Sequence, residues 1–270
     1  MSTLATFCGK HGDILWALPT VRALSEARGE RIDFVIGGEF AGLLPILRQQ
    51  PYLGTVYACD TWGLSSPETW KVPQTWLDQH PEIDEVFDVS YRGWPELDLA
   101  RTAEANLHRA WPDTYGPLPQ IDLERPWMQI QNPWPVATIA VGFTEEWFEL
   151  KLGLLIAAMR DKDYVQLTPP ASRWITEGSY SISKMGTDWT TAAEILAGAR
   201  GFVGDCSALH VLAIALGKPC VIVEPSQDRW NPIFWPKGIT GHGVECVMGN
   251  DGRPSFDARA LRAKIQEMFP

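Results

Sequence analysis

Two segments of the sequence place small residues and polar side chains where a strand is expected to give way to a helix. The first, Gly201–His210, reads G-F-V-G-D-C-S-A-L-H and is followed by an apolar helix and the strand-like run C-V-I-V. The first N–H groups of a helix have no helical partner, and with the helix dipole they form a site for an anion such as a diphosphate. Ser207 and His210 add a hydroxyl and an imidazole that could donate to a phosphate or a ribose.

The same segment also fits an ordinary crossover between two parallel strands. In that interpretation Asp205 caps the helix and His210 is a core histidine with satisfied hydrogen bonds. The glycine pattern is too weak to decide between the two interpretations, because many turns use glycine.

The second segment, Gly9–Asp13, reads G-K-H-G-D and stands between an expected strand and an expected helix. A carboxylate at that position, Asp13, could deprotonate an incoming hydroxyl group as a general base. Its alternative role is that of a helix N-cap. Lys10, His11 and Gly12 are candidates for contacts with an acceptor or with phosphate.

Both segments resemble motifs of the heptosyltransferase family, which transfers ADP-heptose to lipopolysaccharide. Gly12–Leu24, G-D-I-L-W-A-L-P-T-V-R-A-L, is similar to the family's N-terminal segment, and Asp205–His210 is similar to its D-T/S-G-L-x-H motif. The resemblance implies a GT-B fold and an inverting, metal-independent glycosyl transfer with Asp13 as the catalytic base. It also implies a nucleotide-sugar site with Thr144 as one contact. The other residues that the resemblance places there are Asp205, Cys206, Ser207, Ala208 and His210.

Apolar runs and helical periodicity alternate along the chain, which predicts an α/β protein with parallel sheets. Two Rossmann-like lobes facing an interdomain cleft are the expected architecture. The expected strands are Leu4–Cys8, Ile32–Ile36, Thr55–Ala58, Val86–Val89, Val136–Val141, Tyr164–Leu167, Phe202–Val203, Cys220–Val223 and Val244–Met248. The expected helices are Ile14–Leu24, Phe40–Leu47, Leu97–Ala110, Glu145–Arg160, Asp188–Ala199, Cys206–Leu216 and Phe256–Met268. Pro19 is expected to kink the first helix or to start a second helical piece.

Prolines concentrate between residues 111 and 135, and this stretch is expected to be the linker between the lobes. Residues 1–110 then form an acceptor-binding lobe, and residues 136–270 form the lobe that binds the nucleotide sugar. The family resemblance implies that the closing helix crosses back to the first lobe.

Composition argues against several classes of protein. The net charge of −10 gives no basic footprint for nucleic acid, and the five cysteines show no paired spacing for a disulfide framework or a zinc site. The sequence shows no signal peptide, no membrane-spanning run and no acidic metal motif, which predicts a cytoplasmic protein that needs no metal.

The sequence therefore predicts an inverting glycosyltransferase that uses a nucleoside diphosphate sugar as donor substrate, no further cofactor, and a saccharide or another hydroxyl compound as acceptor. A transferase of the same fold that modifies a hydroxylated base of phage-type DNA is one alternative, although the acidic charge does not favour it. A binding module that has kept the nucleotide pocket and lost catalysis is the other.

Overall fold

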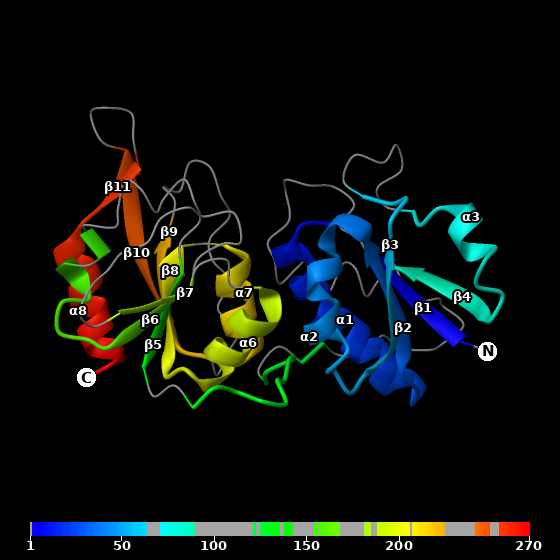
Figure 1. Ribbon diagram of the computed structural model, residues 1–270, viewed down its shortest axis with the longest axis horizontal. Coiled ribbons are helices and arrows are strands. Elements are labelled where there is room, and N and C mark those ends of the chain that lie inside the picture. The colour runs from blue at the N-terminus through cyan, green and yellow to red at the C-terminus, as the bar shows by residue number, and fades with distance from the viewer. Residues whose placement is uncertain are drawn as a thin grey trace. The chain divides into compact units, whose positions relative to one another are not determined.

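Figure 1 presents the protein as a computed structural model. It describes residues 2–63, 71–89, 121–122, 125–135, 138–142, 154–155, 157–167, 181–184, 188–205, 207–224, 241–248 and 254–270. Contacts divide the chain into two units, Met1–Gln129 and Ile130–Pro270, each with its own sheet. The division falls inside the proline-rich stretch between residues 111 and 135.

The first unit is built on a four-stranded parallel sheet in the order β3-β2-β1-β4. Strands β1 and β2 are buried along almost their whole length, as expected for parallel strands covered on both faces. The strands are β1 Ser2–Phe7, β2 Ile32–Gly37, β3 Leu53–Cys59 and β4 Ile83–Asp88. The helices are α1 His11–Arg28, the 3-10 helix η1 Gly38–Leu43, α2 Leu44–Leu47 and α3 Gln74–Leu77.

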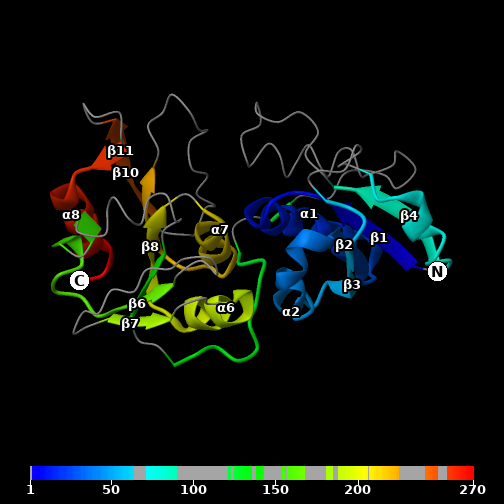
Figure 2. The ribbon, with the colours of Figure 1, turned by 45° about the horizontal axis from the view of Figure 1, so that its top comes forward.

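Helix α1 packs across β1, β2 and β3 of this sheet (Figure 2). It runs through Pro19 as one helix, so the prediction that a second helical piece starts there is wrong. Proline has no N–H, so the carbonyl group of Leu15, four residues earlier, receives no hydrogen bond from within the helix. The buried indole of Trp127 donates to that carbonyl instead, with Nε1 3.1 Å from the oxygen.

Residues 125–129 are fixed to the first unit by hydrogen bonds. The hydroxyl group of Tyr52 donates to the carbonyl of Trp127 at 2.7 Å. The Gln50 amide donates to the carbonyl of Gln129 at 3.1 Å and accepts from the Gln129 N–H at 2.9 Å. This segment therefore completes the first unit.

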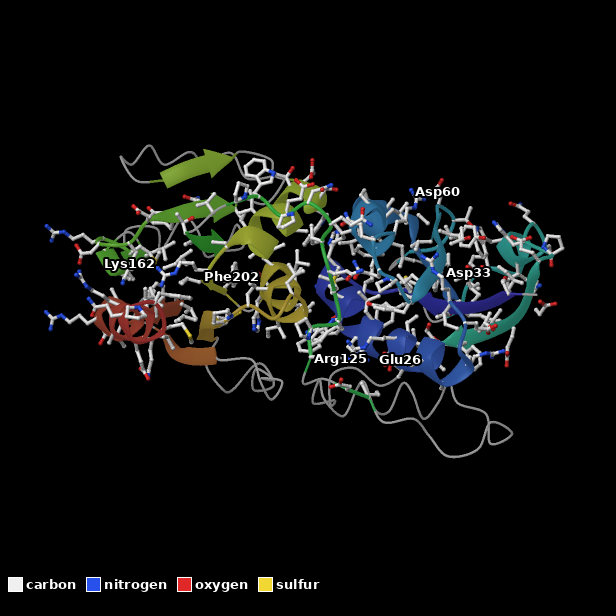
Figure 3. The ribbon with its side chains drawn as sticks, turned by 90° about the horizontal axis from the view of Figure 1, so that it is seen from below. Glu26, Asp33, Asp60, Arg125, Lys162 and Phe202 are labelled. Carbon is white, nitrogen blue, oxygen red and sulfur yellow. The ribbon has the colours of Figure 1, made fainter. Side chains whose placement is uncertain are left out.

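Two arginines bind the same segment to α1. The buried guanidinium group of Arg22 donates to the carbonyl of Pro126 at 3.0 Å and to that of Asp122. Arg125 forms an ion pair with Glu26 at the surface (Figure 3). An exposed pair of this kind adds little stability, whereas the buried Arg22 depends on its carbonyl partners.

The second unit is built on a seven-stranded sheet in the order β11-β10-β9-β8-β5-β6-β7, parallel except for the pair β10 and β11. The strands β7 and β11 were not predicted. The strands are β5 Ile139–Gly142, β6 Tyr164–Leu167, β7 Ser181–Lys184, β8 Gly201–Asp205, β9 Cys220–Glu224, β10 Gly241–Met248 and β11 Pro254–Phe256. The helices are α6 Trp189–Gly198, α7 Ala208–Ala215 and α8 Ala258–Met268.

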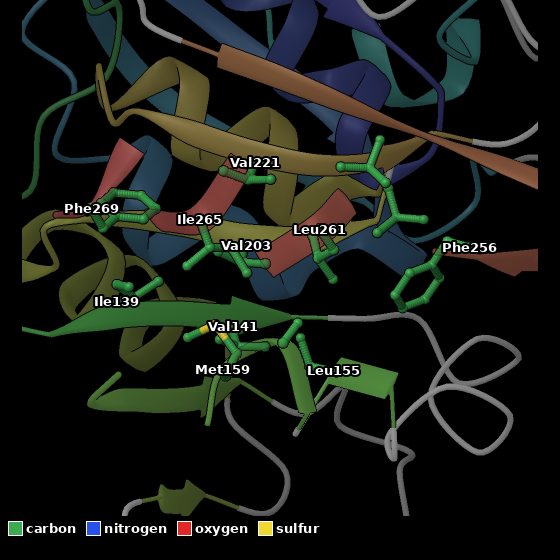
Figure 4. Packing of buried hydrophobic residues seen from close by; sticks show 13 residues of the cluster. Ile139, Val141, Leu155, Met159, Val203, Val221, Phe256, Leu261, Ile265 and Phe269 are labelled. Atoms are coloured by element: carbon green, nitrogen blue, oxygen red, sulfur yellow. The ribbon is translucent and has the colours of Figure 1, made fainter. Parts of the chain in front are cut away.

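Helix α8 packs on the sheet of the second unit, which corrects the expectation that the closing helix crosses back to the first lobe. Its buried residues Leu261 and Ile265 contact a cluster that includes Val203 of β8 and Val221 of β9 (Figure 4). An apolar stripe on one side of a polar helix favours this placement, because the stripe must be buried against a sheet.

The ends of α6 and α7 are defined by their capping residues. Asp188 accepts a hydrogen bond from the Thr191 N–H at 2.7 Å, as predicted for the start of α6. After α7, Gly217 adopts a left-handed conformation with φ of 73°. The Lys218 ammonium group then donates to the carbonyls of Ala197 and Ala199 at the end of α6, at 2.6 and 3.1 Å.

The predicted helix Leu97–Ala110 and most of the predicted helix Glu145–Arg160 lie outside the described residues. Within the described part of the chain, none of the helices combines the length and apolar composition that a membrane crossing needs.

Candidate active site

In each unit, the strands are first added on one side of the starting strand and then on its other side. The order of the strands therefore gives each sheet one topological switch point. In the first sheet, β2 and β3 extend to one side of β1 and β4 lies on the other. In the second sheet, β6 and β7 extend to one side of β5, and β8, β9 and β10 lie on the other. Ligands of open parallel sheets bind outside the carboxyl ends of the strands at such points. The two segments singled out in the sequence follow β1 and β8, which both border these points.

The segment after β8 presents the start of α7. Ser207 is the N-cap, so the helix begins at Ala208, two residues later than predicted. The first hydrogen bond of the helix joins the Val211 N–H to the Ser207 carbonyl at 3.2 Å. The N–H groups of Ala208 and Leu209 precede that bond, which gives this end of the helix the donors of an anion site.

The alternative prediction that Asp205 caps this helix is wrong, because Asp205 is the last residue of β8 and the capping position belongs to Ser207. Asp205 is 3% exposed. The hydroxyl oxygen of Ser207 is also inaccessible to solvent and has no hydrogen-bond partner among the described residues.

Two glycines bring the end of β5 close to this helix. Gly142 of β5 pairs with Gly204 of β8, and a Cβ atom on Gly204 would lie 2.1 Å from the Gly142 carbonyl oxygen. A Cβ atom on Gly142 would lie 2.7 Å from Cδ1 of Leu209. The glycines therefore allow a close approach that side chains would prevent. The predicted contacts Cys206 and Thr144 lie outside the described residues.

His210, in the first turn of α7, is 2% exposed. Burial lowers the pKa of its imidazole from 6.5 to about 3, so the ring is neutral near pH 7. A contact from this ring to phosphate stays a prediction, and any such contact is made by a neutral N–H rather than by a positive charge.

The segment after β1 differs from its prediction at the start of α1. Lys10 is the N-cap and the helix begins at His11, so Gly12 and Asp13 are already helical. Asp13 is therefore not the N-cap: it is the third helical residue, and its Oδ2 accepts a hydrogen bond from the Lys10 N–H at 3.1 Å. This is one half of a capping box, and the other half is missing because a lysine side chain has no acceptor.

Asp13 is a partly buried carboxylate at the carboxyl end of β1. Burial raises its pKa above the ordinary value, and the hydrogen bond from the Lys10 backbone and the charge of Lys10 act in the opposite direction. A carboxylate whose pKa is raised by burial is a stronger base than one in water. The electrostatic environment is thus compatible with the predicted role.

Glu39 was missed by the sequence analysis. It lies on η1 directly after β2, the neighbour of β1, and a Cβ atom on Gly63 would lie 2.6 Å from its Oε1. Burial lowers the pKa of the His11 imidazole, and the Glu39 carboxylate partly offsets this effect. The sequence signal for Glu39 would have been its position at the end of the strand that follows β1. Lys10, in contrast, is exposed.

Within the residues that the structure describes, no group of three or more His, Cys, Asp and Glu side chains is arranged to hold a metal ion.

Comparison with solved structures finds the same fold in glycosyltransferases. The chain matches E. coli heptosyltransferase WaaC with ADP-2-deoxy-2-fluoro heptose at 16% identity and a TM-score of 0.59, over 99% of each chain. It matches a glycosyl transferase of family 9 from Veillonella parvula at 11% identity and a TM-score of 0.65, over 99% of this chain and 96% of that one. It also matches an iron-containing dodecameric glycosyltransferase, TibC, from enterotoxigenic E. coli at 15% identity and a TM-score of 0.53, over 94% of this chain and 66% of that one.

Neither the family models nor the curated protein sequences gave a match. Identities of this size establish a common fold rather than a common activity. Three findings agree: the strand order, the division into two α/β units, and the structural match over 99% of the chain. The protein therefore has the GT-B fold, in the form that the heptosyltransferases and family 9 glycosyltransferases have.

Proposed function

We propose that this chain is an inverting glycosyltransferase that moves a sugar from a nucleoside diphosphate sugar to a hydroxyl acceptor without a metal ion. The observation that carries the proposal is that each unit presents one of the two predicted motifs at its own topological switch point. Since switch points bind ligands in open parallel sheets, a donor site in the second unit and an acceptor site in the first are the natural assignment.

In the proposed reaction, the Asp13 carboxylate accepts the proton of the acceptor hydroxyl. The hydroxyl oxygen forms a bond to the anomeric carbon of the donor sugar, and the bond from that carbon to the diphosphate oxygen breaks. The diphosphate leaves with the bonding electrons, and the configuration at the anomeric carbon is inverted. The start of α7 suits the growing negative charge, because the N–H groups of Ala208 and Leu209 and the helix dipole are fixed in advance.

The experiment is a screen of ADP-, UDP- and GDP-linked sugars for turnover, first with water and then with simple sugars as acceptors, in the presence and absence of EDTA. The proposal is supported if the protein turns over one of the donors, if this activity persists in EDTA, and if Asp13→Asn abolishes it. Activity that EDTA abolishes and manganese or iron restores contradicts the metal-independent mechanism. Binding of a nucleoside diphosphate without turnover of any donor identifies a binding module instead.

A further inference from the structure

The carboxyl edge of the first sheet carries one carboxylate for each of its four strands. These residues are Asp13 at the start of α1 after β1, Glu39 on η1 after β2, Asp60 directly after β3, and Asp88 as the last residue of β4. Because the four strands are parallel, their carboxyl ends lie at one edge of the sheet. The proposed function places the acceptor at this same edge, since ligands of such sheets bind outside the carboxyl ends of the strands.

Glu39 and Asp60 are held at the edge by reciprocal contacts between the segments that follow β2 and β3. A Cβ atom on Gly63 would lie 2.6 Å from Oε1 of Glu39, and one on Gly38 would lie 2.8 Å from Oδ1 of Asp60. Each carboxylate thus rests on a glycine of the other segment, and the Gly38 N–H donates to the Trp62 carbonyl at 3.1 Å. Both acidic residues are exposed, as Figure 3 shows for Asp60, so their charges act on a ligand at this edge.

Positive charge is scarce where the strands end. Four segments begin at the carboxyl ends of the strands: residues 8–13, 38–43, 60–63 and 88–89. Against the four carboxylates they contain one lysine, Lys10, and no arginine. His11 adds little charge near pH 7, because burial lowers the pKa of its imidazole below the ordinary value of 6.5.

The rest of the chain that follows β3 and β4 does not reverse this balance. Residues 64–71 and 90–120 together carry four Lys and Arg against five Asp and Glu. An ion pair between any of these residues and a carboxylate of the edge leaves the total charge of the set unchanged. The segments that lead away from the carboxyl edge are therefore negative as a set.

We propose that the acceptor is a hydroxyl compound that carries a positive charge, of the amino sugar type, and that the edge rejects acceptors with carboxylate or phosphate groups. The proposal rests on the proposed function, because it names the acceptor class for the site already assigned to the first unit. The site itself follows from the switch point of the sheet and from Asp13, and the charge selects the ligand. Charges of one sign around a site raise the local concentration of oppositely charged ligands and lower that of like-charged ones. The same charge disfavours a DNA acceptor, whose backbone is anionic.

The first test measures the charge of the edge in the free protein. Two nitroxides with the same ring, one bearing an ammonium group and the other a carboxylate, are added separately, and NMR measures how strongly each relaxes the amide protons. The cation relaxes the amides of Gly12, Glu39 and Gly63 several-fold more than the anion does, and high salt reduces the difference. The double variant Glu39→Gln, Asp60→Asn reduces it as well. Glu82→Gln is the matched control and leaves it unchanged, because Glu82 is an exposed carboxylate before β4, at the opposite edge of the sheet.

The second test measures transfer from the donor found in the screen to glucosamine, glucose and glucuronate, at a pH at which the amine carries its proton. These acceptors share most of their hydroxyl groups and differ in charge. The expected kcat/KM is highest for glucosamine and lowest for glucuronate, with about three- to tenfold between successive acceptors, and high salt brings the three together. The double variant lowers the ratio of glucosamine to glucuronate transfer, and Glu82→Gln does not.

Equal relaxation by the two nitroxides, or stronger relaxation by the anion, overturns the negative charge of the edge. Transfer to glucuronate that equals or exceeds transfer to glucosamine overturns the acceptor class, and so does hydrolysis of the donor with transfer to none of the three. The donor site of the proposed function survives these outcomes. If no donor is turned over at all, the proposed function is wrong and the acceptor class with it, whatever the nitroxides show.

Discussion

At the scale of single residues, Asp13 combines a structural and a proposed chemical role. Its Oδ2 accepts a hydrogen bond from the Lys10 N–H, and burial raises its pKa. A raised pKa means that folding disfavours the ionised form, so an ionised Asp13 at neutral pH lowers the stability of the folded state relative to a neutral residue. Side chains kept in spite of such a cost are found preferentially at functional sites.

Asp13→Asn separates the two roles. Asparagine keeps an oxygen for the Lys10 N–H and loses only the favourable charge in the first turn of the helix, so the stability of the protein changes by about 1 kcal/mol or less. It cannot take up the proton of the acceptor, so the rate of transfer falls by roughly a hundred- to ten-thousand-fold. Thermal unfolding, nucleotide binding and turnover measured on one preparation check the combination. A variant that transfers sugar at the wild-type rate would return Asp13 to its structural role and leave His11 as the next base to test.

His210 yields a prediction about acid stability. Its pKa is about 3 in the folded protein and 6.5 in the unfolded chain, so the unfolded state binds more protons between these values. The contribution of His210 to stability is complete above pH 6.5 and is lost as the pH falls toward 3. Chemical denaturation from pH 8 to pH 4 therefore shows a steeper loss in the wild type than in His210→Asn, by up to about 1.4 kcal/mol per pH unit. The two curves run parallel above pH 6.5, and parallel curves below it as well would contradict the buried, neutral state of the ring.

At the scale of elements, the indole of Trp127 stabilises a helix that contains a proline. Trp127→Phe leaves the buried carbonyl of Leu15 without its donor, at a cost of about 1–3 kcal/mol beyond the loss of volume. Trp62→Phe is the matched control, because Trp62 is equally buried and its indole N–H has no hydrogen-bond partner among the described residues.

The double variant with Pro19→Ala makes this test specific. Alanine at position 19 restores the N–H that α1 lacks, so it recovers part of the loss caused by Trp127→Phe and none of the loss caused by Trp62→Phe. Urea denaturation of the single and double variants measures the coupling. Equal effects of Pro19→Ala in both backgrounds would show that the indole hydrogen bond contributes nothing.

The agreement between sequence and structure was best for the buried strands. The run Tyr164–Leu167 forms β6 with the predicted bounds, because a short and largely apolar segment between turns is typical of a buried strand. The strands β7 and β11 were missed, since the polar S-I-S-K and the short P-S-F carry no such signal. The start of α1 was misplaced because Lys10 lacks a capping side chain and the sequence suggested Asp13 in its place.

The sequence predicted those parts of the candidate site whose residues lie close together in the chain. The local segments that contain Asp13 and Ser207 could be found from the sequence, since each is a strand, a turn and a helix. Glu39 could not be found in this way: its electrostatic effect on His11 depends on β2 pairing with β1, which places η1 at this edge of the sheet. The burial that shifts the pKa values of His11, Asp13 and His210 is likewise a property of the folded chain.

At the scale of the whole molecule, the proposed function assigns the donor to the second unit and the acceptor to the first. It therefore predicts which amides exchange more slowly when a nucleotide binds. ADP, as a probe of the donor site, slows hydrogen exchange of the amides from Ala208 to Leu212 in the second unit. The amides from His11 to Asp13 in the first unit exchange at an unchanged rate, because the proposed function places the donor in the second unit and the acceptor at this segment. Mass spectrometry of exchanged peptides measures both regions in one experiment. Protection by ADP at the start of α1 and none at the start of α7 would reverse the assignment of the units.

The segment at residues 125–129 has a consequence for synthesis in the cell. A chain made from its N-terminus at about 5–20 residues per second presents β1 to β4 well before Trp127 has been added. Until then the Leu15 carbonyl has no donor, the buried position of Trp127 beside Tyr52 is unfilled, and the Gln50 amide lacks its hydrogen bonds to the Gln129 backbone. The nascent first unit therefore lacks these hydrogen bonds until residues 125–129 have been added. We expect the docking of this segment, which is made just before the second unit begins, to complete the folding of the first unit.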